Sequence, residues 1–486
     1  MENFPEIHYF LEIPLPYQIV KVPPRGQKHS KTKHKLKYFV NKVITNLTRD
    51  VFKHCGFKPT TDPNKWNISW GRQFSSNEYI TCKGWQKINH FAGAYLIGRK
   101  DTLHLRMMEL RSKIGKEAKF YPRSYLLPDD KIFLKKAWHK KDLWISKPLA
   151  SARGIGIKIL KSSESSIPKL GLVQVYIPNP LLITGRKFDL RIYICVTSLQ
   201  PLKIYIHSNG LARFSTHLYD PTTTDQKAHL TNFSINRTDQ SFIRCEGEEK
   251  IEDSKWTLPF FFNYLKIQGI DTVKLQKEIE RVSIMTIIAG INSIREVHHG
   301  LICHPYTSYE MYGIDLMIDE KFQVHLIEVN ISPSMNGKDS KLDYDMKFGV
   351  VSDLLSLARI IQCDPESMDP CPCLKALEKA YKESKSRDRV DNVLKGKPAW
   401  KKPIFADFVM IRDFLEEQML SSFGGFHLIF PEIETMHDYC PCFDHLTYED
   451  IVLSQYLSLN SEQKEKIYQK YFDIYSSKIL DIKSSF

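Results

Sequence analysis

Two carboxylates and an amide stand close together near residue 320, in a stretch where apolar and polar side chains alternate. The segment YGIDLMIDEKFQVHLIEVNISPS predicts an antiparallel hairpin with its turn centred between Lys321 and Phe322. Such a hairpin places Asp315 opposite Glu328, with Asn330 two residues further along on the same face. Opposed carboxylates repel each other, so a purely structural hairpin would gain nothing from them. A hard divalent cation removes the conflict, and the three side chains therefore predict a Mg²⁺ site.

A glycine loop is the second feature that could take part in chemistry, in the stretch WISKPLASARGIGIKIL (144–160). We expect a strand over 143–147, a loop over 148–156, and a returning strand whose isoleucines alternate from residue 155. The third glycine of a dinucleotide fingerprint and the GK[ST] ending of a Walker A loop are both missing. The stretch therefore predicts either a plain hairpin turn or a loop whose backbone N–H groups cover nucleotide phosphates.

Charged residues alternate with apolar ones in the segment GRKFDLRIYICV (185–196). On a strand, Lys187, Asp189 and Arg191 share one face, and the apolar side chains between them share the other. This stripe is either an exposed sheet face with cross-strand ion pairs or the charged wall of a site. Arg213 and the tetrapeptide HLTN (229–232) supply further polar groups from neighbouring elements.

The elements that must position these residues alternate between strands and helices. Strands are expected within 172–197, at 311–318 and at 323–329, and a helix that is apolar on most faces is expected around 282–291. Asp101 is the expected N-cap of another helix, which carries apolar residues at three- and four-residue steps.

Together these parts predict a site for Mg²⁺-bound ATP between two sheets. A lysine, a glycine loop, a basic stripe and a late cluster of Asp, Glu and Asn are all carried by strands, which favours the ATP-grasp arrangement. The His-Arg-Asp and Asp-Phe-Gly motifs of protein kinases are absent from the sequence. We predict an α/β (α+β) chain with an ATP-grasp fold, a small N-terminal α/β domain that includes residues 66–98, and a helical C-terminal extension.

Four long motifs carry the features described above, namely WISKPLASARGIGI, VQVYIPNPLLITGRKFDLRIYICVTS, HLTNFSINR, and YGIDLMID followed by HLIEVNISPS. INHFAGAYLIGRKDTL and FYPRSYLLP extend the set toward the N-terminus. In these motifs the sequence closely resembles the tubulin–tyrosine-ligase-like family, in its polyglutamylase branch. The resemblance covers about residues 66–360.

The resemblance implies an ATP-grasp ligase that uses ATP and Mg²⁺, and it assigns roles to residues at matching positions. Nucleotide contacts fall to Lys100, Lys147, Arg153, Gly154, Gly156, Gln174, Val175, Tyr176, Ile177, Lys187, Asp189, His229, Thr231 and Asn232. Arg191 and Arg213, near the γ-phosphate and the acyl-phosphate, form the implied catalytic set with Glu328. Asp315, Glu328 and Asn330 are implied to bind Mg²⁺.

The implied reaction joins free L-glutamate, through an isopeptide bond, to the γ-carboxyl of a glutamate in an acidic tubulin tail. An acyl-phosphate is the implied intermediate, and fixed arginines, lysines and Mg²⁺ suit it because negative charge accumulates in one place. Ile331 follows Asn330 where chain-elongating relatives carry histidine, which favours initiation of the glutamate branch over its elongation. Two alternatives remain open, a tubulin glycine ligase and a microtubule or acidic-protein binding module with a vestigial ATP site.

The charge of the chain is consistent with acidic partners. The net charge is +13, and residues 13–49 contain nine lysines and arginines but no acidic residue, so this segment is either a solvated arm or a docking surface. The expected partners are tubulin or microtubules through their acidic tails, with acidic non-tubulin proteins as further acceptors. No nucleic-acid motif, signal layout or apolar run of about 18 residues is found, so we expect neither nucleic acid nor membrane as a partner. We expect a monomer in the cytoplasm and on the cytoskeleton, including the cilium or basal body.

The predicted boundaries divide the chain into five parts. These are a basic arm (1–60), the N-terminal part of the ligase module (61–99), a central domain with the glycine loop (100–184), a C-terminal domain with the metal site (185–362), and a linker with a helical extension (363–486). The last part contains two Cys-Pro-Cys pairs, Cys371 with Cys373 and Cys440 with Cys442 near His445. One residue between cysteines fits zinc poorly, and we expect free thiols.

Overall fold

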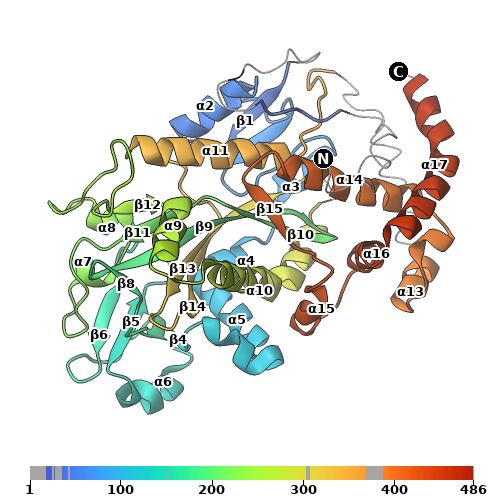
Figure 1. Cartoon of the computed structure of the whole chain (residues 1–486). Coiled ribbons are helices and arrows are strands. Elements are labelled where there is room, and N and C mark those ends of the chain that lie inside the picture. Colours follow the sequence, from blue (N-terminus) through green and yellow to red (C-terminus); the bar gives the residue numbers. More distant parts are fainter. Residues whose placement is uncertain are drawn as a thin grey trace.

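The strand β9 (Arg186–Leu199) runs through the centre of the largest sheet of the computed structural model (Figure 1). The structure describes residues 18–23, 27, 35–41, 44–151, 153–302, 307–367 and 387–484. One edge of β9 pairs with β11 (Leu211–Phe214) and β10 (Leu202–His207), and the other pairs with β13 (Glu310–Ile318). The sheet is completed by β8 (Leu182–Ile183), β12 (Lys255–Thr257), β14 (Val324–Asn330) and β15 (Phe426–Phe430).

Side chains of β9 point alternately into two layers. Leu190, Ile192 and Ile194 belong to the larger hydrophobic core. The helices that supply this core are α4 (Tyr95–Gly98), α5 (Lys100–Ile114), α9 (Leu258–Ile267) and α10 (Thr272–His299). Tyr193 and Cys195 face the other layer, where α11 (Lys341–Leu357) and α2 (Asn46–His54) pack. Figure 1 shows α11 and α10 on opposite sides of the sheet.

The small N-terminal α/β unit is larger than the sequence indicated. A parallel sheet in the order β2-β1-β3 contains β1 (Lys37–Asn41), β2 (Lys58–Thr60) and β3 (Ile68–Gly71). Residues 37–60, which we had assigned to the basic arm, therefore form β1, α2 and β2, because Leu47, Val51 and Phe52 give this segment an apolar face that it buries. A short helix, α3 (Ser76–Thr81), follows with a capping box between Ser75 and Glu78.

The glycine loop belongs to a second, antiparallel sheet in the order β4-β7-β5-β6. Its strands are β4 (Ser124–Leu127), β5 (Leu143–Lys147), β6 (Lys158–Lys161) and β7 (Gly171–Val175), and its flanking helices are α6 (Lys131–Ala137), η1 (Gly115–Phe120) and η2 (Trp138–Lys140). The predicted strand over 143–147 is confirmed as β5. The returning strand begins at Lys158 rather than at residue 155, since Ile155 is 69% exposed and lies in the loop.

Two predicted helices are confirmed, with one correction at a helix start. The apolar helix expected around 282–291 is the centre of α10, which Asp271 caps by accepting a hydrogen bond from the Lys274 backbone. The N-cap of α5 is Arg99, not Asp101. Asp101 lies within the first turn, where a negative charge is favourable at the positive end of the helix dipole, and it forms an ion pair with Arg99.

The predicted hairpin is formed by β13 and β14, with Asp315 directly opposite Glu328 as expected. The predicted turn centre was wrong by half a residue, because the pairs nearest the turn, such as Ile318 with Val324, are centred on Lys321. A register shift after Asp315 compensates for this offset by leaving Ile327 unpaired as a bulge.

The C-terminal segment is mostly helical, as predicted, but it also completes the central sheet. Its helices are α13 (Arg387–Leu394), η3 (Ala399–Lys401), α14 (Phe405–Ser421), α15 (Met436–Tyr439), η4 (Cys440–Cys442), α16 (Tyr448–Leu457) and α17 (Ser461–Ser484). The strand β15, which we did not predict, pairs antiparallel with β10. None of the helices in the described ranges is both long and apolar enough to cross a bilayer.

Candidate active site

A cavity of about 710 Å³ lies between the four-stranded sheet and the beginning of β9. Asp315 and Glu328 from the hairpin line it. It is also lined by ten of the residues predicted to contact the nucleotide: Lys147, Gln174, Val175, Tyr176, Ile177, Lys187, Asp189, His229, Thr231 and Asn232.

A second cavity, of about 530 Å³, adjoins the first and shares Lys147 and Glu328 with it. Lys100, Arg153 and Asn330 line this second cavity. The structure thus brings the distant lysine, the loop arginine and the hairpin amide to the same place. Gly154 and Gly156 line neither cavity and instead shape the loop that carries Arg153.

A network of two arginines and two aspartates covers one face of β9 and its neighbours. Arg213 lies opposite Asp189, and Arg191 lies opposite Asp315, in adjacent strand pairs. The Arg213 guanidinium contacts Asp189 at 2.6 Å and Asp315 at 2.8 Å, while Arg191 donates to Asp315 at 2.5 Å. All four side chains are buried, so the stripe is not the exposed sheet face that one interpretation of the sequence described.

The charges in this network are held in fixed states by their neighbours. Burial opposes ionisation of Asp315, but Arg191 and Arg213 outweigh it and lower the pKa of the carboxyl to about 2. Burial lowers the pKa of Lys147 to about 8, although nearby Glu328 partly opposes that shift. Burial also lowers the pKa of Lys187 to about 7. Two buried ammonium groups with lowered pKa values favour an anionic ligand in the same cavity.

Tyr176, one of the residues predicted to contact the nucleotide, is joined to the HLTN segment by a chain of hydrogen bonds. Lys187 Nζ donates to the Tyr176 hydroxyl at 2.8 Å, and that hydroxyl donates to His229 Nδ1 at 2.7 Å. His229 Nε2 donates to the Thr223 carbonyl at 2.9 Å, which leaves Nδ1 as an acceptor and the imidazole neutral. Burial and the Lys187 charge lower the pKa of His229, in agreement with this state.

The glycine loop folds back over the second cavity, with Arg153, Gly154 and Gly156 all in the left-handed backbone region. A Cβ atom on Gly154 would lie 2.7 Å from Ile235 Cδ1 and 2.9 Å from Asn232 Oδ1. The Ser234 hydroxyl donates to the Arg153 carbonyl at 2.5 Å, and Lys100 Nζ donates to the Ser151 carbonyl at 2.6 Å. The loop is therefore packed against the HLTN segment and is more than a turn between two strands.

The hairpin carries oxygen donors of the kind that Mg²⁺ binds, although both carboxylate oxygens of Asp315 already accept hydrogen bonds from Arg191 and Arg213. The Glu328 side chain makes no hydrogen bond or ion pair with any residue in the described ranges, and it shares the second cavity with Asn330. The Asn330 amide nitrogen donates to the Gly313 carbonyl at 3.3 Å, so its Oδ1 is the atom available to a cation. Two carboxylates and an amide oxygen are ligands that Mg²⁺ accepts beside phosphate.

The described cysteines and histidines do not combine into a second metal centre. Among the described residues, no three His, Cys, Asp or Glu side chains are arranged to hold a metal ion. Cys440 is exposed and Cys442 is buried, both as free thiols. The other Cys-Pro-Cys pair, Cys371 with Cys373, lies outside the described residues, as does most of the basic segment over 13–34.

Sequence reasoning missed several apolar residues that line the cavity. Met317 is two residues from Asp315 on β13 and could have been found from strand alternation. Ile327 could not, because its side chain reaches the cavity only through the bulge, which no sequence pattern marked. The Ile327 carbonyl accepts a hydrogen bond from Lys147 Nζ at 3.3 Å.

Comparison with known proteins gives a consistent result. The family model described as "Tubulin-tyrosine ligase family" matches residues 76–370. "Tubulin monoglutamylase TTLL4" of Mus musculus is 37% identical over 334 residues, which cover 67% of this chain and 28% of the mouse protein. "Tubulin polyglutamylase TTLL5" of Homo sapiens is 33% identical over 343 residues, which cover 68% of this chain and 27% of that protein.

A nematode relative matches over a greater length. "Tubulin polyglutamylase ttll-4" of Caenorhabditis briggsae is 32% identical over 472 residues, which cover 90% of this chain and 76% of the relative. The match to the mammalian proteins, by contrast, spans less than a third of their length.

Proposed function

This chain belongs to the tubulin-tyrosine ligase family, and on that basis we propose that it is an ATP-dependent ligase that joins L-glutamate to glutamate side chains in acidic protein tails. The observation that carries the proposal is the buried network of Asp189, Arg213, Asp315 and Arg191 beside Lys147 and Glu328. Fixed cations around one cavity suit a reaction in which phosphoryl and carboxylate charges meet.

The proposed reaction has two steps. A γ-carboxylate oxygen of the acceptor glutamate attacks the γ-phosphorus of ATP, which forms an acyl-phosphate and releases ADP. The amino nitrogen of free glutamate then attacks the acyl carbon, and phosphate leaves as the nitrogen loses a proton and the isopeptide bond forms. Arg191 and Arg213 would stabilise the charge of the acyl-phosphate, because their guanidinium groups are already oriented by Asp189 and Asp315.

The nucleotide would be held by residues from several elements. Lys100, Lys147 and the loop of Arg153 would bind the phosphates, and Gln174, Val175, Tyr176 and Ile177 with Lys187 would hold the adenine. Asp315, Glu328 and Asn330 would hold Mg²⁺, which when bound would neutralise phosphate charge and polarise the γ-phosphate.

We further propose that the acceptor is tubulin and that the enzyme favours the first glutamate of a branch. The names of its relatives, which include a tubulin monoglutamylase and tubulin polyglutamylases, support a tubulin acceptor. The residue type at position 331 supports initiation, since isoleucine follows Asn330 where, by the resemblance stated above, chain-elongating relatives carry histidine. A location on cytoplasmic microtubules, including the cilium or basal body, and a monomeric state belong to the same proposal.

The experiment is incubation of the protein with ATP, Mg²⁺, microtubules and labelled glutamate, with labelled glycine in a parallel reaction. We expect glutamate to be incorporated, and Glu328→Gln to reduce the rate by about a hundredfold or more. Glu248→Gln is the matched control, because Glu248 is exposed and distant from both cavities. Incorporation that is equal in wild type and Glu328→Gln would contradict the proposal, and preferential glycine incorporation would make the enzyme a glycine ligase.

Mass spectrometry of the modified tails tests the finer proposals. We expect branches of one glutamate to dominate on α- or β-tubulin. Long branches at early times would contradict initiation, and modification confined to added acidic non-tubulin proteins would contradict the tubulin acceptor.

A further inference from the structure

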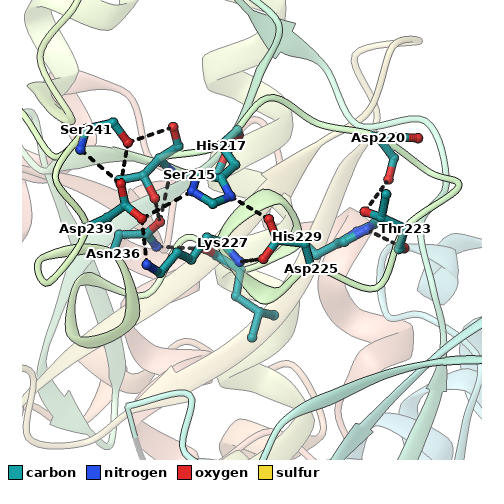
Figure 2. Close-up of polar contacts among 12 residues, drawn as sticks. Ser215, His217, Asp220, Thr223, Asp225, Lys227, His229, Asn236, Asp239 and Ser241 are labelled. Carbon is teal, nitrogen blue, oxygen red and sulfur yellow. Dashed lines mark hydrogen bonds and ion pairs between the residues drawn. The ribbon is translucent and has the colours of Figure 1, made fainter.

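The nucleotide-lining residues His229, Thr231 and Asn232 all lie in the long connection between β11 and β12. This connection contains two short helices, α7 (Gln226–His229) and α8 (Phe233–Asn236). Outside the cavity, residues at the start of this connection meet residues near position 240 in a cluster of polar side chains, which Figure 2 shows around His217. We call residues 215–241 the nucleotide loop.

His217 contacts a carboxylate through each of its ring nitrogens. Its Nδ1 lies 2.5 Å from Asp225 Oδ2, and its Nε2 lies 3.1 Å from Asp239 Oδ2 (Figure 2). A neutral imidazole has one N–H and can donate to only one of two acceptors, whereas the imidazolium donates to both. With both carboxylates ionised, the two contacts favour the protonated ring.

The two aspartates connect His217 to the rest of the nucleotide loop. Asp225 caps α7 by accepting a hydrogen bond from the Lys227 backbone, and Lys227 Nζ donates to Asp239 at 2.6 Å. Asp239 also accepts a hydrogen bond from the Ser241 hydroxyl at 2.5 Å. His217 thus joins the entry of the loop to the cap of α7 and to the exit of the loop.

A second set of hydrogen bonds connects the residues around His217 to the cavity. The Thr216 backbone and hydroxyl both donate to Asn236 Oδ1, at 2.9 Å and 2.8 Å. Asn236 Nδ2 donates to the Leu230 and Asn232 carbonyls, at 2.8 Å and 3.0 Å. Displacement of residues 216 and 217 would therefore move Leu230 and Asn232, which line the cavity.

We propose that protonated His217 is a positioning residue for the nucleotide. Its hydrogen bonds hold the nucleotide loop in the conformation that places His229, Thr231 and Asn232 at the cavity, so nucleotide affinity falls when His217 loses its proton. This inference rests on the proposed function, because it takes ATP as the ligand. No contact of His217 with the cavity is needed, since it acts through Asp225, Asp239 and Asn236.

The electrostatic surroundings of His217 are consistent with this role. Its hydrogen bond to Asp225 raises its pKa above the ordinary value; burial opposes this shift, and the charges of Asp225 and Asp239 add to it. A histidine with a raised pKa gives its full stabilisation below about pH 6.5. That stabilisation is lost as the pH rises through the raised pKa. The charged groups that face it are these two aspartates and Lys227, which binds the same oxygen of Asp239 as His217.

The test compares ATP affinity at about pH 6 and about pH 8.5 in wild type, His217→Gln and His217→Arg, by calorimetry with Mg²⁺ present. Lys147 and Lys187 also lose charge in this range, but they do so in all three proteins, so their effect cancels in the comparison.

We expect His217→Gln to bind ATP about threefold to tenfold more weakly than wild type at the lower pH and about equally at the higher pH. His217→Arg, with a permanent charge and several donors, should bind more tightly than wild type at the higher pH. An equal affinity ratio of His217→Gln to wild type at both pH values would overturn the inference.

Amide hydrogen exchange of residues 215–241 without nucleotide separates this inference from the proposed function. After correction for intrinsic exchange rates, we expect the loop of the wild type to lose protection as the pH rises, while His217→Arg keeps it. His437→Gln is the matched control, because His437 is 78% exposed and pairs with Asp438 on α15. If exchange in the loop is independent of pH, protonated His217 does not hold the loop in place. If the wild type fails to bind ATP, the proposed function is overturned together with the nucleotide part of this inference.

Discussion

The ammonium of Lys147 is held 5% exposed at the junction of the two cavities, with a backbone carbonyl as its hydrogen-bond acceptor. A buried charge with so little compensation is costly in the free protein, and an anionic ligand relieves that cost. Lysine can fill this role by losing its proton when no ligand is bound, whereas arginine cannot. The two buried arginines of the site, Arg191 and Arg213, accordingly face aspartates.

We predict that Lys147→Ala raises the dissociation constant for ATP by about tenfold to a hundredfold, because a charge-assisted hydrogen bond contributes about 1.5–3 kcal/mol. Since the pKa of Lys147 is about 8 and its charged form binds phosphate, wild-type affinity should fall as the pH rises through that value. Calorimetry at several pH values measures both effects. Lys158→Ala, on the exposed side of β6, is the control and should bind like the wild type. Equal affinity of Lys147→Ala and wild type would remove Lys147 from the phosphate site.

Residue 154 of the glycine loop has to be glycine, since its φ of +78° and its close neighbours both exclude a side chain. We predict that Gly154→Ala lowers kcat/KM for glutamate incorporation by about tenfold or more, because a strained backbone costs about 1–3 kcal/mol and the new methyl displaces Asn232. Gly247→Ala is the control, because a Cβ there meets no atom within 4 Å. Steady-state kinetics at varied ATP check the result, and full activity of Gly154→Ala would show that the loop shape is not needed.

At the scale of elements, sequence patterns predicted those strands whose two faces differ in polarity. Alternation located β13, β14 and the polar face of β9, because a one-residue shift would have buried charges in the core. No sequence pattern marked the bulge at Ile327. The prediction that Asp315 faces Glu328 was confirmed, although the predicted turn centre was wrong by half a residue. A bulge is decided by the contacts of the whole sheet rather than by the residues around it.

Other elements could not be predicted because tertiary contacts decide them. The strand β15 has the short apolar sequence FHLIF, which periodicity cannot distinguish from part of a helix, and its assignment depends on the free edge of β10. The segment over 37–60 looked like part of the arm because it continues the basic run before it, whereas the apolar residues of α2 decide its packing. Lys100 was added to the site by family resemblance alone, since it is far from Asn330 in sequence and shares a cavity with it only through the fold.

At the scale of the whole molecule, the net charge of +13 creates a long-range field that attracts an acidic partner. We predict that binding to microtubules weakens by about tenfold or more when the salt concentration rises from about 0.05 M to about 0.2 M, because the screening length shortens over that range. ATP affinity should change much less, since Lys147 and Lys187 are buried. Co-sedimentation and calorimetry in the same buffers measure the two quantities. Microtubule binding that is insensitive to salt would mean that apolar contacts dominate the association.

The C-terminal helices are fixed to the ligase core by buried ion pairs, which makes them part of one cooperative structure. Asp450 on α16 accepts hydrogen bonds from Arg295 on α10 at 2.8 Å and from the Leu202 backbone on β10 at 2.9 Å, and both Asp450 and Arg295 are 3% exposed in their side chains. Asp450 also completes the capping box of α16 with Thr447. A single carboxylate therefore joins three elements from distant parts of the chain.

We predict that Asp450→Ala lowers the free energy of unfolding by about 3–5 kcal/mol, because it leaves the Arg295 guanidinium buried without its counter-charge. Urea denaturation followed by circular dichroism measures the change, and tryptophan fluorescence should report the same midpoint, since core and C-terminal helices unfold together. Asp438→Ala is the control, because Asp438 is 63% exposed and pairs only with the exposed His437. If Asp450→Ala unfolds at the wild-type midpoint, the helices from α14 onward are an independent extension. If Asp450→Ala instead unfolds at a lower urea concentration than the wild type and also loses ATP binding, the C-terminal segment supports the sheet that carries Arg191 and Asp315.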